Sequence, residues 1–219
     1  MMRRMILPLL FGLIGAAILI GLGQWQMQRL QWKLGMLSEI EARIMAEPVA
    51  LPAEGQGTPF QPVRAEGRLT GEYLRVLVSR KLVGPGYRII AVLETGGRRV
   101  LVDLGFLPDG EAVPALAGAA EIVGNLHDPV EVDSHTPTPD LTKNLWFARD
   151  VPAMAAALTT EPTFIVAREQ VLPEIEALPI DTSVIPNDHL GYAVTWFSLA
   201  AGWLGMTALF LWRIRRRIA

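Results

Sequence analysis

Cysteine is absent from the 219 residues of the chain. Its absence excludes disulfides, thiolate metal sites and a cysteine nucleophile. The chain also lacks the G-x-S-x-G motif of serine hydrolases, the H-E-x-x-H motif of zinc peptidases and a phosphate-binding Walker loop. We therefore predict that the protein is not an enzyme.

Histidine is scarce, with His127, His135 and His189 as its only positions. The first two lie in polar loops rich in aspartate. Such a loop is compatible with a metal site or a general base, but a solvated histidine is the simpler interpretation. His189 differs because it immediately precedes a long apolar run.

Basic charge is concentrated at the two ends of the chain. Lys and Arg total 20 against 22 Asp and Glu, and six arginines lie in residues 1–4 and 213–219. The middle of the chain therefore has 14 basic and 22 acidic residues. An acidic domain is a poor candidate for binding nucleic acid, so we expect the terminal arginines to be topology signals.

Two long uncharged runs account for the mean hydropathy of +0.31. They occupy residues 5–23 and 190–212. A helix of roughly 20 residues crosses a hydrocarbon core of about 30 Å, so each run predicts a transmembrane helix in contact with membrane lipid. The first run could instead be a cleaved signal peptide, but its apolar core exceeds the usual ~7–15 residues and no A-x-A site follows. We expect it to be retained.

The arginines beside both runs predict that both termini are cytoplasmic. The expected order is a cytoplasmic segment 1–4, a transmembrane helix 5–23, an exported domain 24–189, a second transmembrane helix 190–212 and a cytoplasmic basic tail 213–219. No Arg- and Ser-rich transit peptide precedes the first run. We therefore predict a multi-pass protein of a bacterial inner membrane whose main domain is periplasmic.

The exported domain is predicted to be rich in β-strands. Residues 23–47 favour a leading juxtamembrane helix, and residues 150–159 favour a short helix with Asp150 as its N-cap. Between and after them lie short alternating apolar runs joined by glycine turns, at 63–69, 73–79, 87–94, 98–105, 120–126 and 163–169. The predicted fold class is an α+β membrane protein with two transmembrane helices flanking an antiparallel sheet or a small, partly open barrel.

His189 begins a helical stripe that includes Tyr192 and Trp196. Small residues beside this stripe would let the first apolar helix approach, and its outer end carries Trp25 and Arg29. One interpretation is that His189 and Asn187 cap the helix while the aromatic residues anchor it in the membrane interface. The other is that His189 is an axial ligand of haem iron, the aromatic residues stack on the macrocycle, and Arg29 or Lys33 pairs with propionates.

The end segments LGQWQMQRLQWK (22–33) and PNDHLGYAVTWFSLA (186–200) closely resemble the paired end motifs of the Surfeit-locus family of cytochrome c oxidase assembly factors. The middle resembles the family more loosely, in the same order, over VRAEGRL, GPGYRIIAVLE, RRVLVDLGFLPDG, IVGNL and NLWFARDVPAMAAAL. The resemblance covers nearly the whole chain. It departs where the family has a pattern such as R-G-W-V-P and this chain reads Leu104-Gly105-Phe106-Leu107-Pro108.

The resemblance implies a function in the assembly of a haem–copper oxidase. It implies help with haem a binding and insertion into the catalytic subunit, with that subunit and the haem a biosynthesis machinery as partners. It identifies His189 as the residue that would bind the haem iron, and Trp25, Gln26 and Arg29 as the W-Q-x-x-R motif. The alternatives are a scaffold that stabilises an assembly intermediate without haem, and an enzyme acting on haem or lipid.

Overall fold

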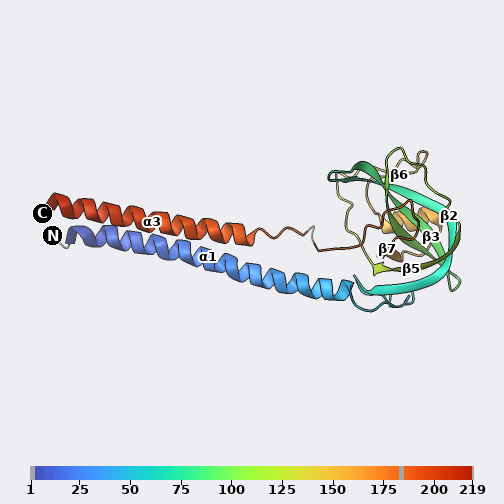
Figure 1. The fold of residues 1–219 in the computed structure, drawn as a ribbon, viewed down its shortest axis with the longest axis horizontal. Helices are drawn as coiled ribbons and strands as arrows, with labels where there is room; N and C mark the ends of the chain where they lie inside the picture. The colour runs from blue at the N-terminus through green and yellow to red at the C-terminus, as the bar shows by residue number, and fades with distance from the viewer. Residues whose placement is uncertain (1–2, 183–184, 219) are drawn as a thin grey trace. The chain divides into compact units, whose positions relative to one another are not determined.

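The computed structural model describes residues 3–182 and 185–218, which fold as two compact units (Figure 1). One unit combines Met1–Glu39 with Thr182–Ala219, and the other is Ile40–Asp181. We call the first the helix pair and the second the barrel. Residues 1–2 and 219, inside the predicted cytoplasmic ends, and residues 183–184, inside the predicted exported domain, lie outside the described residues.

Two long helices form the helix pair. Helix α1 runs from Arg3 to Ile44 and helix α3 from His189 to Ile218. Both are long and apolar enough, by length and composition, to cross a membrane. The predicted juxtamembrane helix is continuous with the first apolar run, because no proline or charged turn separates them, and it ends at Ile44 rather than at residue 47.

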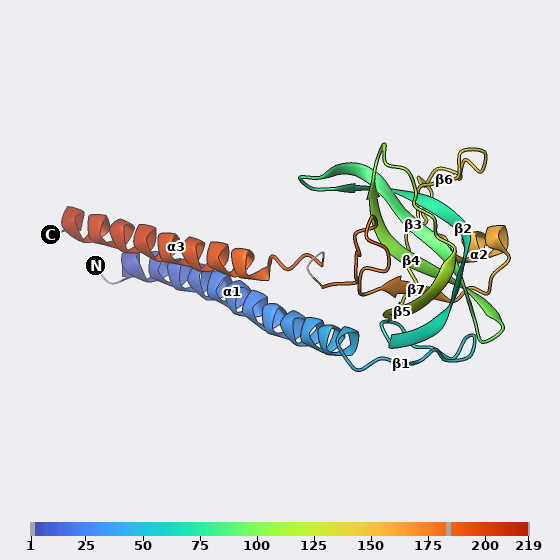
Figure 2. The ribbon, with the colours of Figure 1, turned by 45° about the vertical axis from the view of Figure 1, so that its right-hand side comes forward.

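Seven strands form one sheet among the described residues (Figure 2). Strands β2 (Pro62–Arg80), β3 (Gly84–Thr95), β4 (Arg98–Pro108), β7 (Phe164–Ala167) and β5 (Gly118–Leu126) are neighbours in this order, and β5 also pairs with β2. The sheet therefore closes into a barrel. Short strands β1 (Val49–Ala50) and β6 (Leu145–Trp146) add to β2.

The prediction of an antiparallel sheet is only partly right, because the sheet is mixed. The hairpin partners β2–β3 and β3–β4 are antiparallel, as are β2–β5 and β5–β7. The pairs β4–β7, β1–β2 and β2–β6 are parallel. Strand β7 can lie parallel to β4 because about 55 residues and helix α2 separate them, which is long enough for a crossover.

Strand β2 joins two segments that the sequence predicted as separate strands. The expected turn at Thr70-Gly71 is a bulge inside β2, where the register with β3 shifts between Leu69 and Tyr73 and Gly71 has φ 94°. Glycine adopts this left-handed conformation without a Cβ clash, so the strand bends instead of ending. The bend lets β2 pair with β5 over its first half and with β3 beyond it.

The barrel is packed on both faces of its central strands. Along β3, Ile89, Ala91 and Leu93 enter one apolar cluster while Ile90 enters the other. The second cluster includes Val151 and Met154 of helix α2 (Val151–Leu158). The predicted N-cap is confirmed, since the Asp150 carboxylate accepts a hydrogen bond from the Ala153 N–H at 3.1 Å. Helix α2 thereby covers one face of the sheet.

Candidate functional site

Helices α1 and α3 pack antiparallel at close range. A Cβ added to Gly12 would lie 2.2 Å from Thr207, and one added to Gly15 would lie 2.5 Å from Trp203. One added to Gly23 would lie 2.6 Å from Phe197. The Trp203 indole N–H donates to the Gly12 carbonyl at 2.9 Å. Glycines on α1 thus make room for large side chains on α3.

The two helices meet along a seam of residues spaced three and four apart. The buried positions of this seam on α1 are Gly12, Ala16, Gly23, Gln26 and Leu30, and those on α3 are Ala193 and Ala200. His189, Trp196 and Trp203 continue the α3 stripe and are partly buried. This spacing is that of a left-handed helix pair. The sequence predicted that small residues of α3 would allow close approach, and Ala193 and Ala200 do so.

A polar contact lies at the end of this seam. The side-chain oxygen of Gln26 is 2.8 Å from Nδ1 of His189, and Gln26 is only 8% exposed. A carbonyl oxygen only accepts hydrogen bonds, so Nδ1 carries the proton and the lone pair of the neutral ring is on Nε2. Gln26 therefore orients His189 and leaves Nε2 able to bind a metal ion.

The other predicted site residues lie on the same two helices and differ in their exposure. Trp25 is 51% exposed and Tyr192 is 57% exposed. Trp196 is partly buried beside the seam. The Arg29 guanidinium lies over the ring of Trp32, 4.6 Å from its centroid. The described polar partner of His189 is thus Gln26, a residue that the helical stripe alone did not select.

Gln26 could have been found from the sequence by pairing the two apolar runs as antiparallel helices. A buried amide between two apolar helices needs a hydrogen-bond partner. His189 is the polar residue of the second helix at the level of Gln26. The W-Q-x-x-R motif also contained it. The missing step was the register between helices, which depends on the glycines at positions 12, 15 and 23.

The segment before α3 also contacts α1. The Lys33 ammonium donates to the Pro186 carbonyl, so this lysine holds the entry to α3. The buried side-chain oxygen of Asn187 has no hydrogen-bond partner among the residues that the structure describes. An unpartnered acceptor two residues from His189 is costly unless a donor reaches it.

These residues fit the chemistry of a haem. An imidazole with a free Nε2 can bind iron, exposed aromatic side chains can lie against a flat macrocycle, and Arg29 can pair with carboxylates at its edge. An apolar hollow of about 600 Å³ near Phe11, Trp203 and Phe210 lies at the other end of the pair. The hollow is lined by the N-terminal part of α1 and the C-terminal half of α3, whereas His189 is the first residue of α3, so the hollow is separate from His189.

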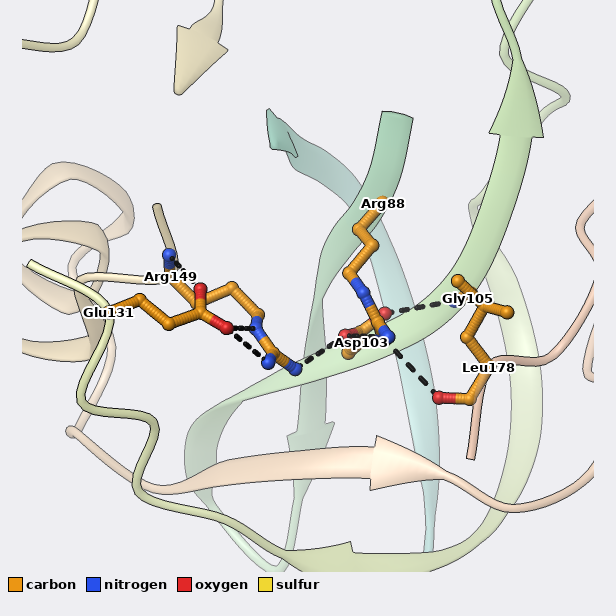
Figure 3. Close-up of polar contacts among 6 residues, drawn as sticks. All are labelled: Arg88, Asp103, Gly105, Glu131, Arg149 and Leu178. Atoms are coloured by element: carbon orange, nitrogen blue, oxygen red, sulfur yellow. Dashed lines mark hydrogen bonds and ion pairs between the residues drawn. The ribbon is translucent and has the colours of Figure 1, made fainter. Parts of the chain in front are cut away.

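The barrel contains a second polar cluster (Figure 3). Asp103 is fully buried and accepts from Arg88 at 2.6 Å and from the Gly105 N–H at 3.0 Å, while Arg149 lies 3.6 Å away. Arg149 also binds Glu131. Burial raises the pKa of Asp103, and the two arginines oppose this. Two cations and two anions balance, which is typical of a structural network.

The remaining histidines lie in the barrel. His127 is partly buried and stacks on Phe60 with 5.8 Å between ring centroids, so it is not the solvated side chain that its loop suggested. Burial, followed by the charge of Arg149, lowers the pKa of His127. His135 is exposed. Within residues 3–182 and 185–218, no group of three or more His, Cys, Asp and Glu side chains is placed to hold a metal ion.

The segment that departs from the family pattern is buried. Gly105 has φ 120°, and a Cβ there would lie 2.1 Å from the Glu176 carbonyl. The Phe106 N–H donates to that carbonyl at 2.7 Å, and Phe106 and Leu107 are each 1% exposed. In this chain Phe106 and Leu107, where the family pattern has other residues, therefore pack inside the barrel.

These features define a class: proteins in which two apolar helices, paired through a buried polar contact, accompany a closed β-barrel. Comparison with known proteins makes the class specific. The model of the SURF1 family matches residues 13–201. The chain belongs to the SURF1 family, as its end motifs predicted.

Relatives from distant organisms cover most of the chain. The human Surfeit locus protein 1 is 31% identical over 209 residues, which is 83% of this chain and 70% of the human protein. The Surfeit locus protein 1 of Rattus norvegicus is 29% identical over 212 residues, 84% of this chain and 69% of the rat protein. A SURF1-like protein of Rickettsia felis is 26% identical over 202 residues, 86% of this chain and 89% of its own length.

Proposed function

We propose that the chain is an assembly factor for a haem–copper oxidase that holds haem a transiently through His189 before insertion into the catalytic subunit. Membership of the SURF1 family supports the general role in oxidase assembly. The contact of Gln26 with His189 supports the haem step, because it directs the Nε2 lone pair away from the protein amide. The role is that of a carrier, without turnover of a substrate.

The residues of the site have separate tasks in this proposal. His189 supplies the ligand nitrogen, and Gln26 holds the ring in one tautomer. Trp25, Tyr192 and Trp196 form the walls, and Arg29 pairs with propionates. When bound, haem a supplies an iron that accepts the imidazole nitrogen. A site in which His189 alone would hold the iron would suit a carrier that must release its haem.

The proposed location is a bacterial inner membrane, with α1 and α3 crossing it and the barrel in the periplasm. The two apolar helices support membrane insertion by length and composition, and the terminal arginines support the orientation. In this location the barrel would meet the catalytic subunit of the oxidase and the haem a biosynthesis machinery.

A second candidate function is a scaffold that stabilises an assembly intermediate without haem. The same contact favours it, because a hydrogen bond between Gln26 and His189 also joins two helices. The two functions differ in what His189 must do. A scaffold needs the Nδ1 contact alone, whereas a carrier needs Nε2 as well.

The test is the visible absorption spectrum of the protein purified in mild detergent from cells that make haem a. We expect a haem a spectrum in the wild type and in His135→Ala, the matched exposed histidine, and its loss in His189→Ala. Haem absent from all three proteins would favour the scaffold. Equal haem in all three would assign the ligand to another residue.

A further inference from the structure

The hairpin formed by β2 and β3 ends in an exposed apolar tip. Leu82 is 99% exposed and Val83 is 55% exposed. Single exposed leucines are common on protein surfaces. Two adjacent apolar side chains exposed at the end of a projecting hairpin are less usual and suggest a binding surface. Figure 2 shows this hairpin extending away from the barrel wall.

The backbone at the tip is also costly. Leu82 has φ 70°, a left-handed conformation that favours glycine or asparagine over leucine. Gly84, two residues further on, has φ 109°, which costs little because glycine has no Cβ. A leucine that is fully exposed and strained contributes neither packing nor turn stability. Its side chain is therefore explained by a contact outside the chain.

The hairpin is basic within an acidic domain. Residues 73–91 include Arg75, Arg80, Lys81 and Arg88 and no Asp or Glu. Arg88 binds Asp103 and Arg80 binds Glu176. Within the described ranges, Arg75 and Lys81 have no ion-pair partner. Arg75 lies farther along the hairpin, paired with Ile89, whereas Lys81 directly precedes the apolar tip. An apolar tip beside an unneutralised cation complements a surface that is apolar in its interior and anionic at its outer layer.

We propose that the tip of the β2–β3 hairpin inserts Leu82 and Val83 into the interfacial layer of an anionic membrane, with Lys81 at the lipid phosphates. Apolar side chains enter the headgroup boundary while basic ones stay at the anionic surface. In the sequence, the barrel unit ends at Asp181, eight positions before His189 begins α3, a helix long and apolar enough to cross a membrane. This proposal is independent of haem binding.

The absence of cysteine makes a direct test possible. Leu82→Cys introduces one thiol into the full chain, which is labelled with bimane and reconstituted into nanodiscs of phosphatidylcholine with phosphatidylglycerol. A spin-labelled phosphatidylcholine then reports contact by quenching. The matched control is Glu66→Cys, which is exposed beside Thr95 at the other end of β3. Twelve residues of strand place the two ends about 36 Å apart.

We expect several-fold stronger quenching at position 82 than at position 66. The excess should fall in discs without phosphatidylglycerol, in high salt and in the Lys81→Glu background. Equal quenching at the two positions would overturn the proposal. So would shielding of position 82 in detergent without lipid, or only after the oxidase catalytic subunit is added, since these would identify the contact as protein.

Discussion

Buried polar groups are arranged differently in the barrel and in the helix pair. In the barrel, Asp103 is bound by Arg88, lies near Arg149 and accepts a backbone N–H. In the helix pair, the buried amide of Gln26 meets one nitrogen of His189. A network in which every charge has a partner stabilises a fold, whereas a pair that leaves a ring nitrogen unused can bind a ligand. The comparison therefore separates structural polar groups from candidate functional ones.

The largest effect is expected from removing the central carboxylate of the barrel. Asp103→Ala leaves the partly buried Arg88 and Arg149 without their shared carboxylate, although Arg149 keeps Glu131, and it should lower the free energy of unfolding by about 3–5 kcal/mol. Thermal and chemical unfolding of the full chain in detergent measures this. Glu121→Ala is the control, because its ion pair with Arg64 is half exposed and should contribute less than about 1 kcal/mol. Equal losses would show that the network is not structural.

A smaller loss is expected from crowding the helix seam. Gly15→Leu should displace Trp203, break its hydrogen bond to the Gly12 carbonyl and cost about 1–3 kcal/mol. The measurements are the unfolding midpoint and the tryptophan emission spectrum. Gly21→Leu is the matched control, since a Cβ there meets no atom within 4 Å. If both variants behave alike, the close approach of the helices is wrong.

The smallest effect is expected from pH. Burial alone would raise the pKa of Glu131, but hydrogen bonds from the Arg149 side chain and backbone outweigh it and lower that pKa. The stabilisation from Glu131 is thus complete above its ordinary pKa of 4.5 and is lost as pH falls through the lower folded value. Glu131→Gln should be less stable at neutral pH and should lose less stability on acidification below 4.5.

The wild type and Glu54→Gln, an exposed loop variant, serve as references for that titration. Their unfolding midpoints should fall in parallel as the pH is lowered. A parallel curve for Glu131→Gln would mean that the contact with Arg149 forms without stabilising the ionised carboxylate.

The sequence predicted local structure more completely than register. Alternation and glycine turns identified the β3–β4 hairpin, and the Asp150 N-cap followed from its position before a helix-forming run. The bulge at Gly71 was missed because a turn and a bulge use the same left-handed glycine. The parallel pairing of β7 with β4 was missed because no local pattern distinguishes parallel from antiparallel neighbours over four residues.

At the candidate site, too, the local feature was predicted and the long-range contact was not. His189 stood out because a titratable ring at the start of an apolar run is unusual. Gln26 did not, since an amide near a membrane interface is ordinary until the opposite helix is placed against it. Long-range pairing of this kind depends on packing across 163 residues of sequence, which no helical stripe encodes.

The place of β7 has a consequence for how the barrel is made. Although it is the last strand in the chain, β7 lies between β4 and β5 and completes the closed sheet. During synthesis, β4 and β5 therefore each have an unpaired edge until residues 164–167 have been made. A chain truncated before this point would have an open sheet that can pair with strands of other chains. The four residues of β7 thus close the sheet, and without them the nascent domain would be prone to aggregate.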